Sequence, residues 1–154
     1  MASASSRLYR CEGRGCGSRT TLAPMNNAVS AAVGAIAGIG TDLVTEHRSS
    51  KQRAMALAAG LIVAAAIYPL ARRERRPGAP LAREIAGLIG SGAILTAAAR
   101  STPTQARNLV AAGWAAHAVF DMVHDGGEAS KIPSWYPAMC AGYDLAVAGR
   151  LVTA

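Results

Sequence analysis

The sequence predicts an all-α integral membrane protein, a polytopic bundle of transmembrane helices, and its composition is the first indication. Apolar residues make up 51% of the 154 positions, yet only one of them is Phe. Soluble cores depend on aromatic side chains for buried area, whereas helices that pack inside a bilayer favour small residues, because their backbones must approach closely. The composition therefore favours membrane spans.

The second indication is a series of five apolar runs of 17 to 19 residues, at 27–44, 52–70, 81–99, 107–124 and 137–153. As helices rising ~1.5 Å per residue they would extend about 26 to 28 Å, near the lower limit for crossing the hydrocarbon layer. We predict five spans, or four if the first run, which is rich in Ala and Gly and contains Asp42, stays outside.

Each run is bounded by residues typical of membrane loops. The first follows Met25-Asn26, and the others follow charged, Pro-containing or Gly-containing segments at 47–51, 72–78, 100–103 and 126–133. Residues 1–24 are polar and contain no apolar run, so we expect a disordered leader, or translation that begins at Met25, ahead of one transmembrane domain at 25–154. Small residues four apart, Gly34 with Gly38 and Ala86 with Gly90, predict close helix crossings within the chain.

The net charge of +7 could indicate nucleic acid or anionic lipid as a partner. The basic residues occur in short clusters between apolar runs and do not alternate with aromatic residues, so we expect no nucleic-acid binding. Alternating spans put the leader, the 72–83 segment and Lys131 on one face, which the positive-inside rule places in the cytoplasm. On that face Tyr68, Trp135 and Tyr136 would mark the interface, and anionic lipid headgroups could contact four arginines, Arg72, Arg73, Arg75 and Arg76.

Ionisable residues inside the predicted spans are the candidates for a functional site, because each costs ~2.5 to 3.5 kcal/mol to insert. His117, Asp121 and His124 follow one another at i, i+4 and i+7, within roughly 60° of one helix face. Alternating topology brings these three to the same side of the bilayer as three acidic residues, Glu84, Asp125 and Asp144. Asp42 and Glu46 would lie at the opposite side.

This cluster leaves three interpretations open. The carboxylates could accept hydrogen bonds from His117, Trp114 or Tyr143 and so fasten the spans together. His117, Asp121, His124 and Asp144 could instead hold a divalent metal such as zinc or iron, with Glu84 as a further catalytic candidate. The chain would then be a metal-dependent or acid–base enzyme acting on a lipid or another apolar substrate. A small proton or ion transporter is the third interpretation.

The same region resembles a family of small bacterial integral membrane proteins of unknown function. Their signature is Gly-Trp-x-x-His-x-x-Trp-Asp-x-x-His, followed by Pro-x-Trp-Tyr-Pro and Cys-x-Gly-x-Asp. Phe120 stands here where the family tends to have Trp. The resemblance implies a multi-pass protein of the bacterial inner membrane but no activity. The matching residues are Gly113, Trp114, His117, Asp121, His124, Pro133, Trp135, Tyr136, Pro137, Cys140, Gly142 and Asp144.

Overall fold

The computed structural model describes residues 26–124 and 130–153, and these form five α-helices. The predicted leader and Asp125 lie outside the described residues. Each predicted apolar run corresponds to one helix, so the all-α class is confirmed. The helices are α1 (Asn27–Thr45), α2 (Ser50–Leu70), α3 (Ala79–Arg100), α4 (Pro103–Val123) and α5 (Tyr136–Thr153).

Polar side chains fix the first turns of three helices. Asn26 caps α1 by accepting a hydrogen bond from the Ala28 N–H. Ser49 with Gln52 starts α2 and Thr102 with Gln105 starts α4, each pair forming a capping box in which side chain and backbone bond reciprocally. Such caps satisfy backbone donors that the helix itself cannot pair.

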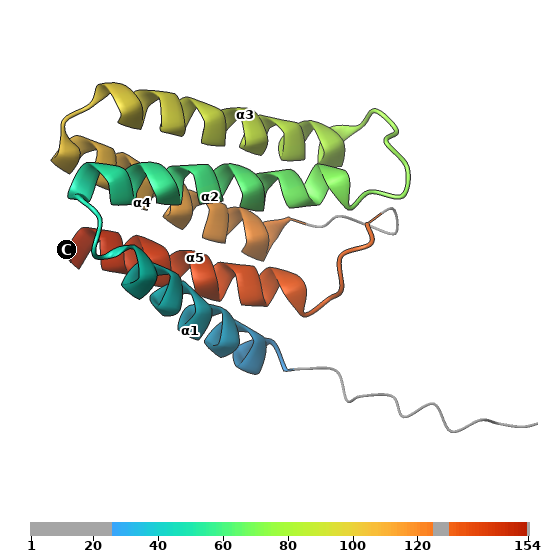
Figure 1. Ribbon diagram of the computed structural model, residues 1–154. Coiled ribbons are helices and arrows are strands. Elements are labelled where there is room, and N and C mark those ends of the chain that lie inside the picture. The colour runs from blue at the N-terminus through green and yellow to red at the C-terminus, as the bar shows by residue number, and fades with distance from the viewer. Residues whose placement is uncertain (1–25, 125–129, 154) are drawn as a thin grey trace, which may run out of the picture.

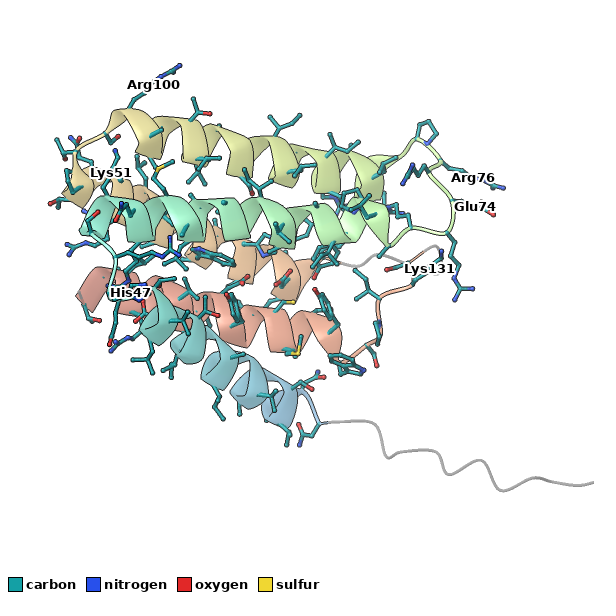
Figure 2. The ribbon with its side chains drawn as sticks, in the orientation of Figure 1. His47, Lys51, Glu74, Arg76, Arg100 and Lys131 are labelled. Carbon is teal, nitrogen blue, oxygen red and sulfur yellow. The ribbon has the colours of Figure 1, made fainter. Side chains whose placement is uncertain are left out.

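Successive helices run in opposite directions, so the bundle has two distinct ends (Figure 1). α2, α3 and α4 pack against one another, α5 packs on α4, and α1 packs on α5. Glu74, Arg76 and Lys131 lie at one end, here called the Lys131 end, and Lys51 and Arg100 lie at the other, the Lys51 end (Figure 2). At the Lys131 end the two loops touch, because the Lys131 N–H donates to the Ala71 carbonyl at 2.9 Å. The predicted alternation of the helices is therefore confirmed.

The outer surface is apolar and several polar side chains are buried, which is the arrangement expected in lipid. Large aliphatic residues of α1 and α3 are exposed, among them Ile36 at 71% and Ile89 at 68%. Charged and polar residues from four helices are buried instead, including Asp42, Glu84 and Asp144. Within the described residues, α1, α2 and α3 are long and apolar enough to cross a membrane, and they are the candidate spans.

Two glycines of α1 allow it to lie directly on the backbone of α5. A Cβ added to Gly34 would meet the Met139 carbonyl oxygen at 1.8 Å, and one on Gly38 would meet the Tyr143 carbonyl oxygen at 2.6 Å. This confirms the predicted crossing within the chain. The second predicted crossing is wrong: a Cβ on Gly90 would meet nothing within 4 Å, so no helix lies in close contact at that position.

Candidate functional site

A compact cluster of His117, Asp121 and Asp144 lies inside the half of the bundle that is nearer the Lys131 end. His117 Nδ1 lies 2.8 Å from Asp144 Oδ2 across the α4–α5 interface and 3.5 Å from Asp121 Oδ2, one turn along α4. The side chains are buried, with residue exposures of 7% for His117, 2% for Asp121 and 1% for Asp144. The sequence-based prediction that these three residues face inward and meet is confirmed.

Tyr68 is a fourth member of this cluster, hereafter the central cluster, which corrects its predicted place at the membrane interface. Its hydroxyl donates to Asp121 Oδ1 at 2.6 Å and the residue is 4% exposed, so it is not an aromatic residue at the lipid interface. The sequence does contain a pattern that predicts this contact. α2 and α4 run parallel, and Tyr68 and Asp121 each lie two residues before the end of their helix. Residues at equal depth on adjacent parallel helices can meet.

The other expected donors do not reach the carboxylates. The Tyr143 hydroxyl donates to Thr41 Oγ1 of α1 at 3.1 Å, which ties α5 to α1. The Trp114 indole N–H has no hydrogen-bond partner among the described residues, and its ring packs edge-on against Tyr143. Tyr68 and His117 therefore supply the hydrogen bonds to Asp121 and Asp144.

His124 belongs to a different cluster, which corrects the predicted four-residue set. α4 ends at Val123, and the backbone of His124 is extended, so its side chain leaves the stripe of His117 and Asp121. Its Nε2 lies 2.8 Å from Glu84 Oε1. Glu84 comes to the predicted end of the bundle, but its carboxylate is engaged there and does not reach the central cluster.

Arg72 completes this second cluster by binding Glu84 through two hydrogen bonds. Nε donates to Oε2 at 2.6 Å and Nη2 donates to Oε1 at 2.7 Å, a bidentate pair. These bonds raise the pKa of the Arg72 guanidinium above its usual value. The Arg72 side chain is only 6% exposed, so it is not free to bind lipid headgroups, which corrects the predicted contact. Arg73, Arg75 and Arg76 are exposed.

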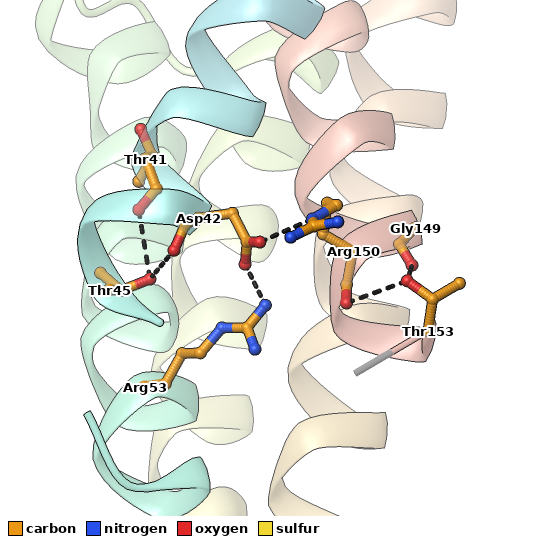
Figure 3. A network of polar contacts seen from close by, with 7 residues as sticks. All are labelled: Thr41, Asp42, Thr45, Arg53, Gly149, Arg150 and Thr153. Atoms are coloured by element: carbon orange, nitrogen blue, oxygen red, sulfur yellow. Dashed lines mark hydrogen bonds and ion pairs between the residues drawn. The ribbon is translucent and has the colours of Figure 1, made fainter. Parts of the chain in front are cut away.

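A third polar cluster lies at the Lys51 end, as the position of Asp42 predicted (Figure 3). The Asp42 carboxylate pairs with Arg53 of α2 and accepts a hydrogen bond from Arg150 Nε of α5 at 2.7 Å. It thus joins α1, α2 and α5. Glu46 is exposed and takes no part. Sequence spacing gave no indication of either arginine partner.

The central cluster differs from the other two clusters in its balance of charge. Asp42 has two arginines and Glu84 has one, so each of these buried carboxylates faces a permanent positive charge. Asp121 and Asp144 share a single imidazole, and neither has an ion pair with Lys or Arg in the described part of the chain. Even with His117 protonated, two ionised carboxylates would leave one negative charge uncompensated.

The donor set can reach a single metal ion. One ligand atom from each of His117, Asp121 and Asp144 can be chosen so that all three lie within 4.8 Å of one another. Imidazole and carboxylate are ligands of zinc and of non-haem iron. His117 Nε2 is buried and has no hydrogen-bond partner among the described residues. Asp121 Oδ2 is also buried and accepts no hydrogen bond from them. The central cluster thus has unused ligand and proton-transfer capacity.

Cavities adjoin the central cluster on different sides. One of about 240 Å³ lies between α2, α3 and α4 and is lined by His117 and Glu84. Another of about 470 Å³ lies at the Lys131 end beneath the first turns of α1 and α5 and reaches Asp121. A third of about 400 Å³ is lined by Trp114 and Asp144. The central cluster is therefore not fully paired, and cavities lie beside its residues.

Comparison of the chain with protein-family models, curated proteins and solved structures gave no match. The resemblance to a family of bacterial membrane proteins therefore stays a prediction.

Proposed function

We propose that the chain is a multi-pass protein of the bacterial cell membrane in which all five helices cross the bilayer. α4 and α5 are long enough, with 21 and 18 residues, or about 32 and 27 Å. Their ionisable residues in the central cluster turn inward, whereas Val119 and Met122 of α4 and Leu145 of α5 are exposed on the outer surface. A low mean hydropathy is compatible with a span when its polar residues face other helices.

Cysteine labelling in intact vesicles tests this topology. With the three native cysteines replaced by Ser, Arg75→Cys and Lys131→Cys should react with a membrane-impermeant maleimide from one side, and Arg100→Cys from the other. If α4 does not cross, Lys131→Cys and Arg100→Cys would react from the same side. The experiment therefore distinguishes five spans from three.

We propose further that the central cluster fastens α2, α4 and α5 together. The supporting observation is the chain of short contacts from Tyr68 of α2 to Asp121 and from His117 to Asp144 of α5, at 2.6 and 2.8 Å. In lipid a separated helix would leave these groups without water to bond, so the separated state is penalised. Interhelical hydrogen bonds in membranes contribute ~0.6 kcal/mol on average and up to about 1.7 kcal/mol.

A double-mutant cycle tests the fastening role. His117→Ala and Asp144→Asn should each destabilise the protein in detergent, with a coupling free energy of about 0.6 to 1.7 kcal/mol between them. Ser91→Ala is the control, because the Ser91 hydroxyl donates to the Gly87 carbonyl of its own helix. It should show no coupling to Asp144→Asn. Strict additivity of the first pair would refute fastening by this contact.

A second candidate function is a membrane-embedded acid–base or metal-dependent centre acting on an apolar substrate. The observation that favours it is the excess of buried negative charge, because an isolated charge in a medium of low dielectric constant is costly. An additional proton or a divalent cation would remove that cost. His117 fits either chemistry, since Asp144 orients the ring through Nδ1 and leaves Nε2 available.

Two measurements on protein purified in mild detergent test this second candidate. Elemental analysis of the wild-type protein should find either one equivalent of zinc or iron, which Asp144→Asn loses, or no metal. If none, infrared spectroscopy should show a protonated carboxylic acid band that disappears in Asp121→Asn or Asp144→Asn. Wild-type protein with neither a bound metal nor a protonated carboxyl group would refute the charge argument.

A further inference from the structure

A pocket at the Lys51 end of the bundle gathers three arginines. Its volume is about 170 Å³, and it is lined by Arg48, Ser50, Arg53, Arg107 and Leu151. Arg48 comes from the loop between α1 and α2, Arg53 from α2 and Arg107 from α4. Like charges repel one another, so a pocket built from three guanidinium groups indicates a negatively charged ligand.

Arg107 has no partner for its charge in the described part of the chain, where it forms no ion pair. The residue is half-buried, and its Nε is fully buried without a hydrogen-bond partner. The two terminal nitrogens also lack partners there, but they are not buried, so a ligand can reach them. A guanidinium only donates hydrogen bonds and keeps its positive charge. Water can accept those bonds, whereas an anion also balances the charge.

Arg53 is only partly engaged by the acid beside it. Its Nη2 pairs with Asp42, whose second oxygen accepts a hydrogen bond from Arg150 Nε. Nη1 of Arg53 has no partner among the described residues and is not buried, so it too is available. Glu46, the other described acid at this end, is exposed and forms no ion pair with a described residue. One shared carboxylate therefore leaves the pocket with an excess of positive charge.

The donors of the pocket favour a phosphate group as the ligand. The planar fork of arginine matches phosphate and carboxylate oxygens in bidentate pairs. A phosphate presents its oxygens tetrahedrally, so guanidinium groups from three parts of the chain can reach it together. The Ser50 hydroxyl adds a further donor. The space is sufficient, because a cavity of about 150 Å³ holds benzene in another protein and a phosphate group is smaller.

The pocket lies at the end of a candidate membrane span. α2 is long and apolar enough to cross a membrane, and Ser50, its first residue, lines the pocket. The ends of a span lie at the level of the lipid headgroups. From these observations we propose that the pocket binds one phosphate group, supplied by the headgroup of an anionic lipid or by free phosphate. The site is separate from the central cluster, goes beyond the function proposed above and requires no chemical step.

Native mass spectrometry of the full chain in a non-ionic detergent tests the lipid source. The probe is phosphatidylglycerol, and diacylglycerol, which lacks the phosphate, is the comparison lipid. We expect the protein to retain one phosphatidylglycerol at concentrations at which it retains no diacylglycerol. A second arm tests free phosphate, which should raise the unfolding temperature more than chloride of equal ionic strength does. Each positive arm identifies its own source, and failure of both arms would overturn the proposal.

Matched arginine variants test whether binding occurs in the pocket. Arg107→Gln should weaken binding of the probe by roughly ten- to a hundredfold, the range of one hydrogen bond to a charged group. Arg100→Gln is the control, because Arg100 is an exposed arginine at the same end that does not line the pocket (Figure 2). It removes the same charge and should leave binding unchanged. Equal loss in the two variants would indicate general attraction to a basic surface and would overturn the proposal.

A second pocket variant makes the test independent of folding defects. Arg48 is exposed and forms no ion pair with a described residue, so Arg48→Gln should keep the circular dichroism spectrum and the unfolding temperature of the wild type. It should weaken binding in the same direction as Arg107→Gln. Wild-type binding by both folded variants would overturn the proposal. The cysteine-labelling topology does not depend on these results, so failure of either proposal can be recognised separately.

Discussion

The crossing of α1 over α5 provides a sharp test of the structure through Gly34→Ala. A Cβ at this position would lie 1.8 Å from the Met139 carbonyl oxygen and 2.8 Å from its carbonyl carbon. Ordinary contact begins at 3.4 Å, so the shortfall at the oxygen is about 1.6 Å. Both obstructing atoms belong to the backbone of α5, and no side-chain rotation can move them. The two helices must separate.

The expected free-energy change combines two opposing effects. Overpacking a close contact costs ~1 to 3 kcal/mol, and a rigid backbone obstacle favours the upper end. Replacing Gly by Ala in a helix contributes about 1 kcal/mol of stability in return. We expect Gly34→Ala to destabilise the protein by roughly 2 kcal/mol. Gly40→Ala in the same helix is the control, because its Cβ would meet nothing within 4 Å. It should be neutral or slightly stabilising.

Reversible unfolding in mixed detergent micelles, followed by circular dichroism, measures the difference between the two variants. The facing helix offers an independent repeat: a Cβ on Gly142 would lie 2.0 Å from the Ala31 carbonyl oxygen, whereas one on Gly149 would meet nothing within 4 Å. Equal stability of Gly34→Ala and Gly40→Ala would show that α1 does not cross α5 as described. A loss confined to Gly34→Ala and Gly142→Ala would support the crossing.

Three further perturbations have defined expected outcomes. Tyr68→Phe removes the donor to Asp121 and should lower the free energy of unfolding by ~0.6 to 1.7 kcal/mol; no change would remove Tyr68 from the central cluster. Arg72→Gln leaves Glu84 buried without its guanidinium and should cost about 3 to 5 kcal/mol, measured by the same unfolding assay, whereas a neutral effect would show that the pair is solvated. Deletion of residues 1–24 should leave membrane insertion intact, because the leader contains no apolar run, and loss of the protein from the membrane fraction would contradict this.

The helices could be predicted because each is an apolar run between polar or Pro-containing segments, but the polar first turn of α4 could not be found in the same way. The fourth run was predicted from residue 107, whereas α4 begins at Pro103. Its first turn contains the polar residue Gln105, which a search for apolar runs excludes. That residue caps the helix with Thr102. Capping patterns locate a helix start better than hydropathy does.

Helical spacing was sufficient for two of the site residues and misleading for a third. His117 and Asp121 lie one turn apart on α4, so their shared face follows from the sequence. His124 fails the same argument because α4 ends one residue before it. Asp144 was found from its depth, since alternation of the helices brings it to the same end. The same depth argument, applied to Tyr68, would have found the fourth member.

The ionic partners of Asp42 and Glu84 could not be predicted, because they come from helix ends and loops whose contacts depend on tertiary packing. Their positions nevertheless show how the chain treats buried charge. Where a carboxylate serves to join helices near either end of the bundle, an arginine neutralises it. Asp121 and Asp144 lie deeper and are joined by His117, whose charge can change with protonation. A permanent cation would have served for fastening alone. An imidazole can also exchange a proton or bind a metal, and the central cluster is therefore the place where a chemical function of this protein should be sought.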